Sequence, residues 1–123
     1  YIKARQKAAA FYNKAFAPYT SIITTPYIAP YSTHVYHQYT IQLKSINRNA
    51  LHNYLATQNI PSMIYYPIPA HQQKMFAQYK MDYQLPITNK LTTCVLSLPI
   101  HTELNEEQLQ YITTHIINYV KNN

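Results

Sequence analysis

The chain has 123 residues, of which 47% are hydrophobic, and it carries a formal net charge of +6. This length corresponds to one domain with a core, and the composition is that of a globular rather than a disordered protein. No apolar run approaches the ~20 residues of a membrane-spanning helix, and the basic residues beyond the first segment are scattered. We therefore expect neither a membrane nor a nucleic-acid partner.

The numbers of cysteines and glycines exclude further kinds of protein and site. Cys94 is the one cysteine, which excludes an internal disulfide and fits a cytoplasmic protein. The first sixteen residues are too charged and too poor in apolar residues for a signal peptide. The sequence has no glycine and therefore neither common Gly-rich phosphate-binding loop. Its ten asparagines are expected to take some of the left-handed backbone positions instead.

The first half of the chain is predicted to hold two regular helices and one regular strand. In order, we expect a helix over 2–16, an irregular connection over 17–33 with one short extended piece at 21–25, a strand over 34–44 and a helix over 45–58. The strand is predicted from the strict alternation of apolar and polar residues. Asn47 is the expected N-cap of the second helix, and Asn59 takes the place of a C-terminal glycine.

The second half is predicted to add two strands and a long final helix. Residues 62–66 predict a buried strand that Pro67 ends. Before the final helix we expect a short helix at 72–79, a turn over 80–86, one helical turn at 87–91 and a strand over 93–98. The helix over 102–121 begins with Asn105 and Gln108 at capping-box spacing. The order predicts an α+β fold, with a small sheet of about three strands and helices packed on it.

The residues that usually carry catalysis or bind metals do not combine into a site. His34 and His37 lie three apart on a predicted strand and so point to opposite faces, and the Cys/His spacing of a zinc site is absent. Cys94 lies in a predicted apolar strand, where an inert core thiol is expected. Asp82 stands alone, and the three glutamates belong to a helix start. We therefore predict neither a bound metal nor catalytic residues.

Tyr65, Tyr66 and His71 are the candidate binding residues. They lie on a loop that Pro67 and Pro69 stiffen, just past a predicted strand end, where binding groups are commonly placed. Strand alternation sends one tyrosine inward and one outward, so one of them is expected at a ligand. Hydroxyls with an imidazole suit a sugar or a phosphate, although the local pattern alone favours packing. Five other tyrosines are predicted in the core: Tyr36, Tyr39, Tyr54, Tyr111 and Tyr119.

Three segments carry a resemblance to a known family. They are HVYHQYTI (34–41) with NRNAL (47–51), NIPSMIYYPIPAHQQ (59–73), and LPITNKLTTCVLSLPIHTELNEEQLQYI (85–112). In order and spacing they resemble the C-terminal part of the DegT/StrS-type sugar aminotransferases. These are pyridoxal-phosphate enzymes of the aspartate aminotransferase fold that aminate keto sugars carried on nucleotides. The YYPIPAHQQ form is most similar to members that aminate the sugar at C3.

The resemblance implies that residues 1–123 are a single small domain, the C-terminal third of a longer homodimeric enzyme. The family's large domain, which carries the Schiff-base lysine and the cofactor phosphate site, has no counterpart here. Isolated, this chain is expected to bind no pyridoxal phosphate and to be inactive. In the full enzyme, Tyr65, Tyr66 and His71 carry over as residues on the side of the nucleotide sugar, facing a cleft that also takes the amino acid donor. His34 and His37 match the motif and are expected to be structural.

The sequence departs from the family pattern at two positions. The family usually has glycine where this chain has Asn59, and an acidic residue where it has Asn49. Both departures are expected to affect the stability of the chain rather than its family. Two other interpretations stay open: a stand-alone α+β module that binds an anionic ligand, and an edited or designed domain without function.

Overall fold

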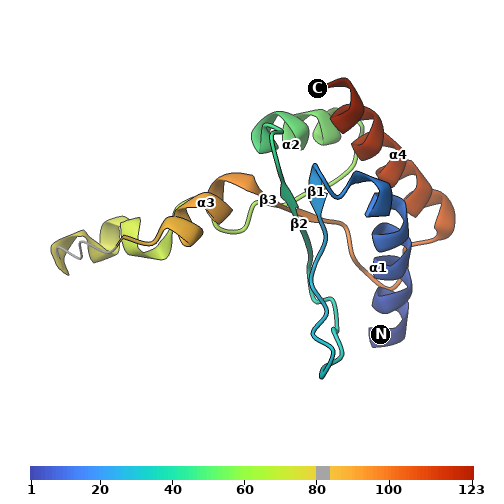
Figure 1. The fold of residues 1–123 in the computed structure, drawn as a ribbon, viewed down its shortest axis with the longest axis horizontal. Helices are drawn as coiled ribbons and strands as arrows, with labels where there is room; N and C mark the ends of the chain where they lie inside the picture. Colours follow the sequence, from blue (N-terminus) through green and yellow to red (C-terminus); the bar gives the residue numbers. More distant parts are fainter. Residues whose placement is uncertain (80–83) are drawn as a thin grey trace.

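A computed structural model of the chain describes residues 1–79 and 84–123, so Asp82 and residues 80–83 of the predicted turn lie outside the described residues. A three-stranded antiparallel sheet carries three long helices on one face (Figure 1), which confirms the predicted α+β class. In chain order the elements are α1 (Ile2–Phe16), η1 (Ala17–Tyr19), β1 (Ile23–Thr24), β2 (Tyr39–Leu43), α2 (Arg48–Thr57), η2 (Ala70–Gln72), η3 (Lys74–Tyr79), α3 (Pro86–Cys94), β3 (Val95–Leu98) and α4 (Glu106–Asn122). No helix of the described residues is long and apolar enough to cross a membrane.

The central strand β2 sorts its side chains between the two faces of the sheet. It pairs antiparallel with β1 and β3, and Tyr39 and Ile41 lie opposite Leu98 and Leu96. Tyr39 and Ile41 are fully buried beneath the helices. Thr40 alternates to the other face, where its hydroxyl is hydrogen-bonded to that of a β3 serine at 2.7 Å. The predicted alternation is therefore confirmed within β2.

Each of the three long helices contributes a stripe of buried apolar side chains to this core. α1 buries Tyr12 and Phe16 among smaller alanines, and α4 buries Leu109, Ile112 and Ile116. The capping box at the start of α4 is confirmed, as is the N-cap of α2, where the asparagine side chain accepts the Ala50 N–H at 3.0 Å. α1 and α4 lie side by side and pack together, although they come from opposite ends of the chain (Figure 1).

Two predicted strands are shorter than expected. The segment before β2 is not extended, because Tyr36 has φ +49°, and the Nδ1 of His34 accepts the Tyr36 N–H at 2.9 Å. The turn confines the strand to Tyr39–Leu43. Likewise, residues 93–94 belong to α3, so β3 begins at Val95 and Cys94 is a half-buried residue at a helix end. The prediction of Cys94 in a core strand is wrong, because α3 runs further than one turn.

The buried strand predicted over 62–66 is also wrong. Only Met63 pairs, in a single bridge with Ser97 at the outer edge of β3. Met63, Tyr65 and Tyr66 are all exposed, and Ile64 is only partly buried against the core. The short helix predicted at 72–79 is present as two 3₁₀ segments, η2 and η3.

Residues 65–79 and 84–94, which we call the arm, extend from the body on the side away from α1 and α4 (Figure 1). Of the arm's described residues only Pro69 and Thr92 are buried. Its exposed large apolar side chains are Tyr65, Tyr66, Ile68, Met75, Tyr79, Leu85 and Ile87. The arm thus has no hydrophobic core of its own.

Candidate functional site

A hollow of about 280 Å³ lies where the arm leaves the body, and we call it the Tyr65 hollow. Three chain segments meet there: the residues that lead into β2, the end of β3 with the turn after it, and residues 61–65. They contribute His37, His101, Tyr65 and Ser62 as polar lining and Met63 with Leu98 as apolar lining. Hydroxyls and imidazoles beside apolar side chains suit a hydroxyl-rich ligand such as a sugar.

The walls of the Tyr65 hollow are fixed by hydrogen bonds to neighbouring elements. The Oγ of Ser62 is hydrogen-bonded to the Nδ1 of His52 on α2 at 2.7 Å. Behind the hollow, the Tyr12 hydroxyl on α1 donates to the carbonyl of Pro99 at 2.8 Å. The segments on either side of the hollow are thus tied to the helical layer, which holds their spacing before any ligand binds.

Two buried tyrosines support the sheet beneath this wall. Tyr12 and Tyr39 are completely buried, and their rings lie 4.8 Å apart. Tyr39 donates to the Oδ1 of Asn13 at 2.7 Å. Burial raises the pKa of both phenols well above the ordinary value for tyrosine, because the phenolate form loses hydration in the core. Both groups are therefore neutral structural donors.

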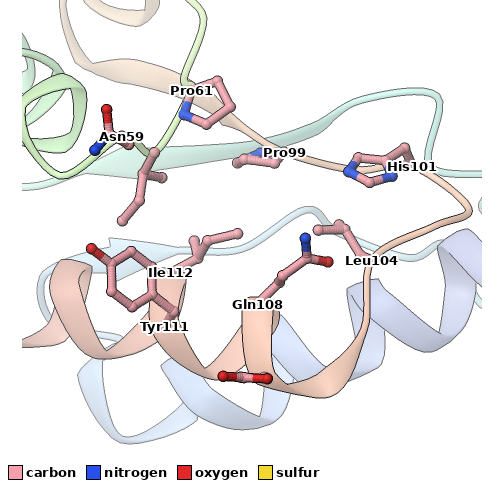
Figure 2. Close-up of a pocket in the computed structure, with 10 residues that line it drawn as sticks. Asn59, Pro61, Pro99, His101, Leu104, Gln108, Tyr111 and Ile112 are labelled. Atoms are coloured by element: carbon pink, nitrogen blue, oxygen red, sulfur yellow. The ribbon is translucent and has the colours of Figure 1, made fainter.

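A second hollow of about 350 Å³ adjoins the first, and we call it the α4 groove (Figure 2). Pro61, Pro99 and His101 line both hollows. Figure 2 shows Tyr111 and Gln108 on α4 opposite the prolines. Tyr111 is 47% exposed, and its hydroxyl donates to the Gln58 carbonyl at 3.2 Å. Its predicted place in the core is wrong, because it lies on the flank of α4 beside the groove.

The structure separates the three predicted site residues. Tyr65 lines the hollow, whereas Tyr66 and the half-buried His71 are not among its lining residues and lie further along the arm. Tyr65 and Tyr66 are 51% and 73% exposed. The predicted inward and outward orientation is therefore wrong, since it required a strand that does not form.

Sequence reasoning missed the imidazoles of His37 and His101 as lining groups. The predicted strand gave His37 the same face as the buried Tyr39, but the turn at Tyr36 leaves His37 exposed and beside the hollow. The only available signal for His101 was its position after Pro99 at a strand end. Within the described residues, no group of three or more His, Cys, Asp or Glu side chains could hold a metal ion.

The described lysines do not form a pyridoxal-phosphate site. Every lysine outside residues 80–83 is exposed, and none lines the Tyr65 hollow or the α4 groove. A Schiff-base lysine must lie in a pocket that also holds the cofactor ring. Among the described residues, neither hollow therefore presents a lysine amine that could form a Schiff base with this cofactor.

The chain is similar to known proteins in both sequence and fold. The family model described as the DegT/DnrJ/EryC1/StrS aminotransferase family matches residues 1–117. The chain belongs to this family. The resemblance carried by the three sequence segments is thereby confirmed, and the small sheet with its helical layer is the corresponding part of the aminotransferase fold.

Individual relatives match this chain over most of its length. It is 49% identical over 83 residues to UDP-N-acetyl-3-dehydro-alpha-D-glucosamine 3-aminotransferase of Acidithiobacillus ferrooxidans, covering 68% of the chain and 22% of that protein. It is 38% identical to the pleiotropic regulatory protein of Geobacillus stearothermophilus, covering 95% and 32%. A family aminotransferase from Brucella abortus has a TM-score of 0.83 at 29% identity, covering 96% and 31%. The chain thus spans about a third or less of these relatives.

Proposed function

We propose that this chain is the C-terminal domain of a pyridoxal-phosphate-dependent aminotransferase. The full enzyme transfers an amino group from an amino acid to a nucleotide-linked keto sugar, in the biosynthesis of amino sugars or surface polysaccharides. The match to the family model over residues 1–117 carries the proposal. Pyridoxal phosphate supplies the electron sink for this exchange when bound, and its lysine comes from a part of the protein outside this chain.

The substrate class follows from the relative from A. ferrooxidans, whose name states a UDP-linked 3-dehydro amino sugar. We propose the same class here, with amination at C3, in a cytoplasmic homodimer. The hydroxyl and imidazole groups that line the Tyr65 hollow support a sugar at this position. The exposed apolar side chains of the arm support a large domain or second subunit that covers them in the full enzyme.

We assign Tyr65, Tyr66 and His71 to contacts with the nucleotide sugar. Tyr65 opens onto the hollow, and the exposed Tyr66 and half-buried His71 lie further along the same segment, beside the space between the arm and the rest of the enzyme. We propose no part for the three in the exchange of the amino group itself. Their role is to orient the sugar, and their loss is expected to affect substrate binding.

Kinetics of the full enzyme test this assignment. Tyr65→Phe and Tyr66→Phe each remove one hydroxyl, so each is expected to raise the KM for the nucleotide sugar about five- to tenfold, since one hydrogen bond contributes about 1 kcal/mol. The KM for the amino donor is expected to stay within twofold. Tyr31→Phe is the matched control, because Tyr31 is 91% exposed and lines neither hollow. Equal effects on both substrates would indicate packing instead.

The isolated chain provides a separate test of the domain assignment. We expect no absorbance from bound pyridoxal phosphate and no transamination when the 123 residues are expressed alone. The full-length protein is expected to show both. A cofactor imine formed on this chain alone would contradict the proposal.

A further inference from the structure

Arg48 occupies an unusual position for an arginine. It is the first residue of α2, and only 7% of its surface is exposed. A cation in the first turn of a helix is opposed by the helix dipole, and a buried cation is costly unless its donors are paired. Some other element must therefore offset the cost of placing it there.

The partners of Arg48 identify that element as α3. Its Nη2 donates to the Thr92 carbonyl and its Nη1 to the Val95 carbonyl, both at 2.9 Å. These carbonyls belong to the last turn of α3 and to the residue that follows it. A helix C-terminus attracts positive charge and presents carbonyls without intrahelical partners. The planar guanidinium fork meets both acceptors at once, which a lysine ammonium on its flexible stem does not reproduce.

In the part of the chain that the structure describes, hydrogen bonds attach the arm to the body at or beside β3 in two places. Its outgoing limb is fixed just before Tyr65, where Met63 and Ser97 exchange two backbone hydrogen bonds of 3.0 Å. Its returning limb is fixed by Arg48 at Thr92 and at Val95, which follows the limb. Farther out, the Nε2 of Gln72 donates to the Oδ1 of Asn89 at 3.3 Å and links the two limbs. Because the arm has no core of its own, its direction depends on these attachments and on the packing of α3 against β2.

We propose that Arg48 is a positioning residue that fixes the arm, and through it Tyr65, Tyr66 and His71, for the nucleotide sugar. This inference rests on the proposed function only for the identity of the ligand. Arg48 fastens the returning limb, the Gln72–Asn89 contact transmits this order to the outgoing limb, and the outgoing limb presents the three side chains. Arg48 itself lines neither hollow.

Amide hydrogen exchange tests the clamp on the chain itself, which has its own hydrophobic core. Arg48→Lys keeps the charge and loses the two-carbonyl geometry. We expect exchange in the second half of α3 to accelerate at least tenfold, while amides of β2 and α4 change less than twofold. Lys90→Gln is the matched control, because it removes an exposed cation from α3 without touching these contacts. Unchanged exchange in α3, or equal acceleration in every element, overturns the proposal.

Arg48→Gln provides a second variant if Arg48→Lys does not fold. Its neutral head leaves no unpaired buried cation, and it is too short to reach both carbonyls. The same local acceleration in α3 is expected, and its absence overturns the clamp.

Kinetics of the full-length protein then test the positioning role. Either variant is expected to raise the KM for the nucleotide sugar at least tenfold, with kcat within threefold and the donor KM within twofold. A fall in kcat with an unchanged sugar KM overturns the role. A wild-type protein that transfers no amino group to any nucleotide sugar instead refutes the proposed function, and the exchange result still decides whether Arg48 clamps the arm.

Discussion

At the scale of single residues, Asn59 takes over the task of glycine at the end of α2. Its φ is +56°, and Tyr36 and Ser45 are the other described residues with positive φ. The Asn59 N–H bonds to the Ala56 carbonyl and the Ile60 N–H to the Leu55 carbonyl, which is the Schellman pattern of a helix end. Asparagine enters this conformation more readily than other residues with a Cβ. In a chain without glycine, asparagine therefore takes the left-handed position that ends this helix.

We expect Asn59→Gly to raise the free energy of unfolding by about 0.5 kcal/mol, because the lost Cβ strain outweighs the added freedom of the unfolded chain. Asn59→Ala is expected to lower it by about 1 kcal/mol, since alanine lacks the asparagine preference for this conformation. Urea unfolding at an unchanged m-value measures both. A more stable alanine variant would contradict the strain argument.

At the scale of elements, α2 and α3 are joined through the guanidinium of Arg48, which donates hydrogen bonds to neutral acceptors. The Nε of Arg48 donates to the Oδ1 of the neighbouring Asn49 at 2.7 Å. This acceptor is neutral, whereas the resemblance to the family implies an acid at this position. A carboxylate there would accept the same hydrogen bond with charge assistance and would also suit the positive end of the α2 dipole.

Asn49→Asp is therefore expected to stabilise the chain by about 1 kcal/mol near neutral pH. The control is Asn53→Asp, which makes the same charge change at an exposed position further along α2 and is expected to act within about 0.5 kcal/mol. Thermal or urea unfolding compares the two variants. Equal effects would assign the gain to net charge rather than to Arg48.

Elements with local signals could be predicted from the sequence, whereas elements defined by distant contacts could not. The N-caps and apolar stripes of α2 and α4 each lie within one short segment of sequence. Both helices form where these local signals predict them. Residues 62–66 have the composition of a buried strand, but burial requires a covering layer that no local pattern specifies. The same limit applies to the candidate site: the Tyr65 side chain was predictable, but its meeting with His37 and His101 depends on the turn at Tyr36 and the end of β3.

At the scale of the whole molecule, the two buried phenols make stability depend on alkaline pH. The folded state raises the pKa of Tyr12 and Tyr39 above the ordinary value of about 10. The unfolded chain therefore releases these protons first as pH rises. Their contribution to stability is complete below about pH 10 and falls above it.

We expect the free energy of unfolding to decline above about pH 10 by about 1.4 kcal/mol per pH unit for each buried tyrosine. Tyr39→Phe removes one of these groups and is expected to give a shallower decline. Tyr1→Phe is the control, because Tyr1 is 94% exposed. Urea unfolding between about pH 8 and about pH 11 compares the slopes, and equal slopes for all three chains would refute the assignment.

The pairing of α1 with α4 has a consequence for how the domain is made. The bond from Tyr12 to Pro99 spans 87 residues, and α4 covers the same core that α1 enters first. During synthesis from the N-terminus, the apolar stripe of α1 therefore stays uncovered until α4, its packing partner, has been synthesised. Folding that depends on such distant contacts is slow. The nascent domain thus remains open to chaperones until α4 has left the ribosome.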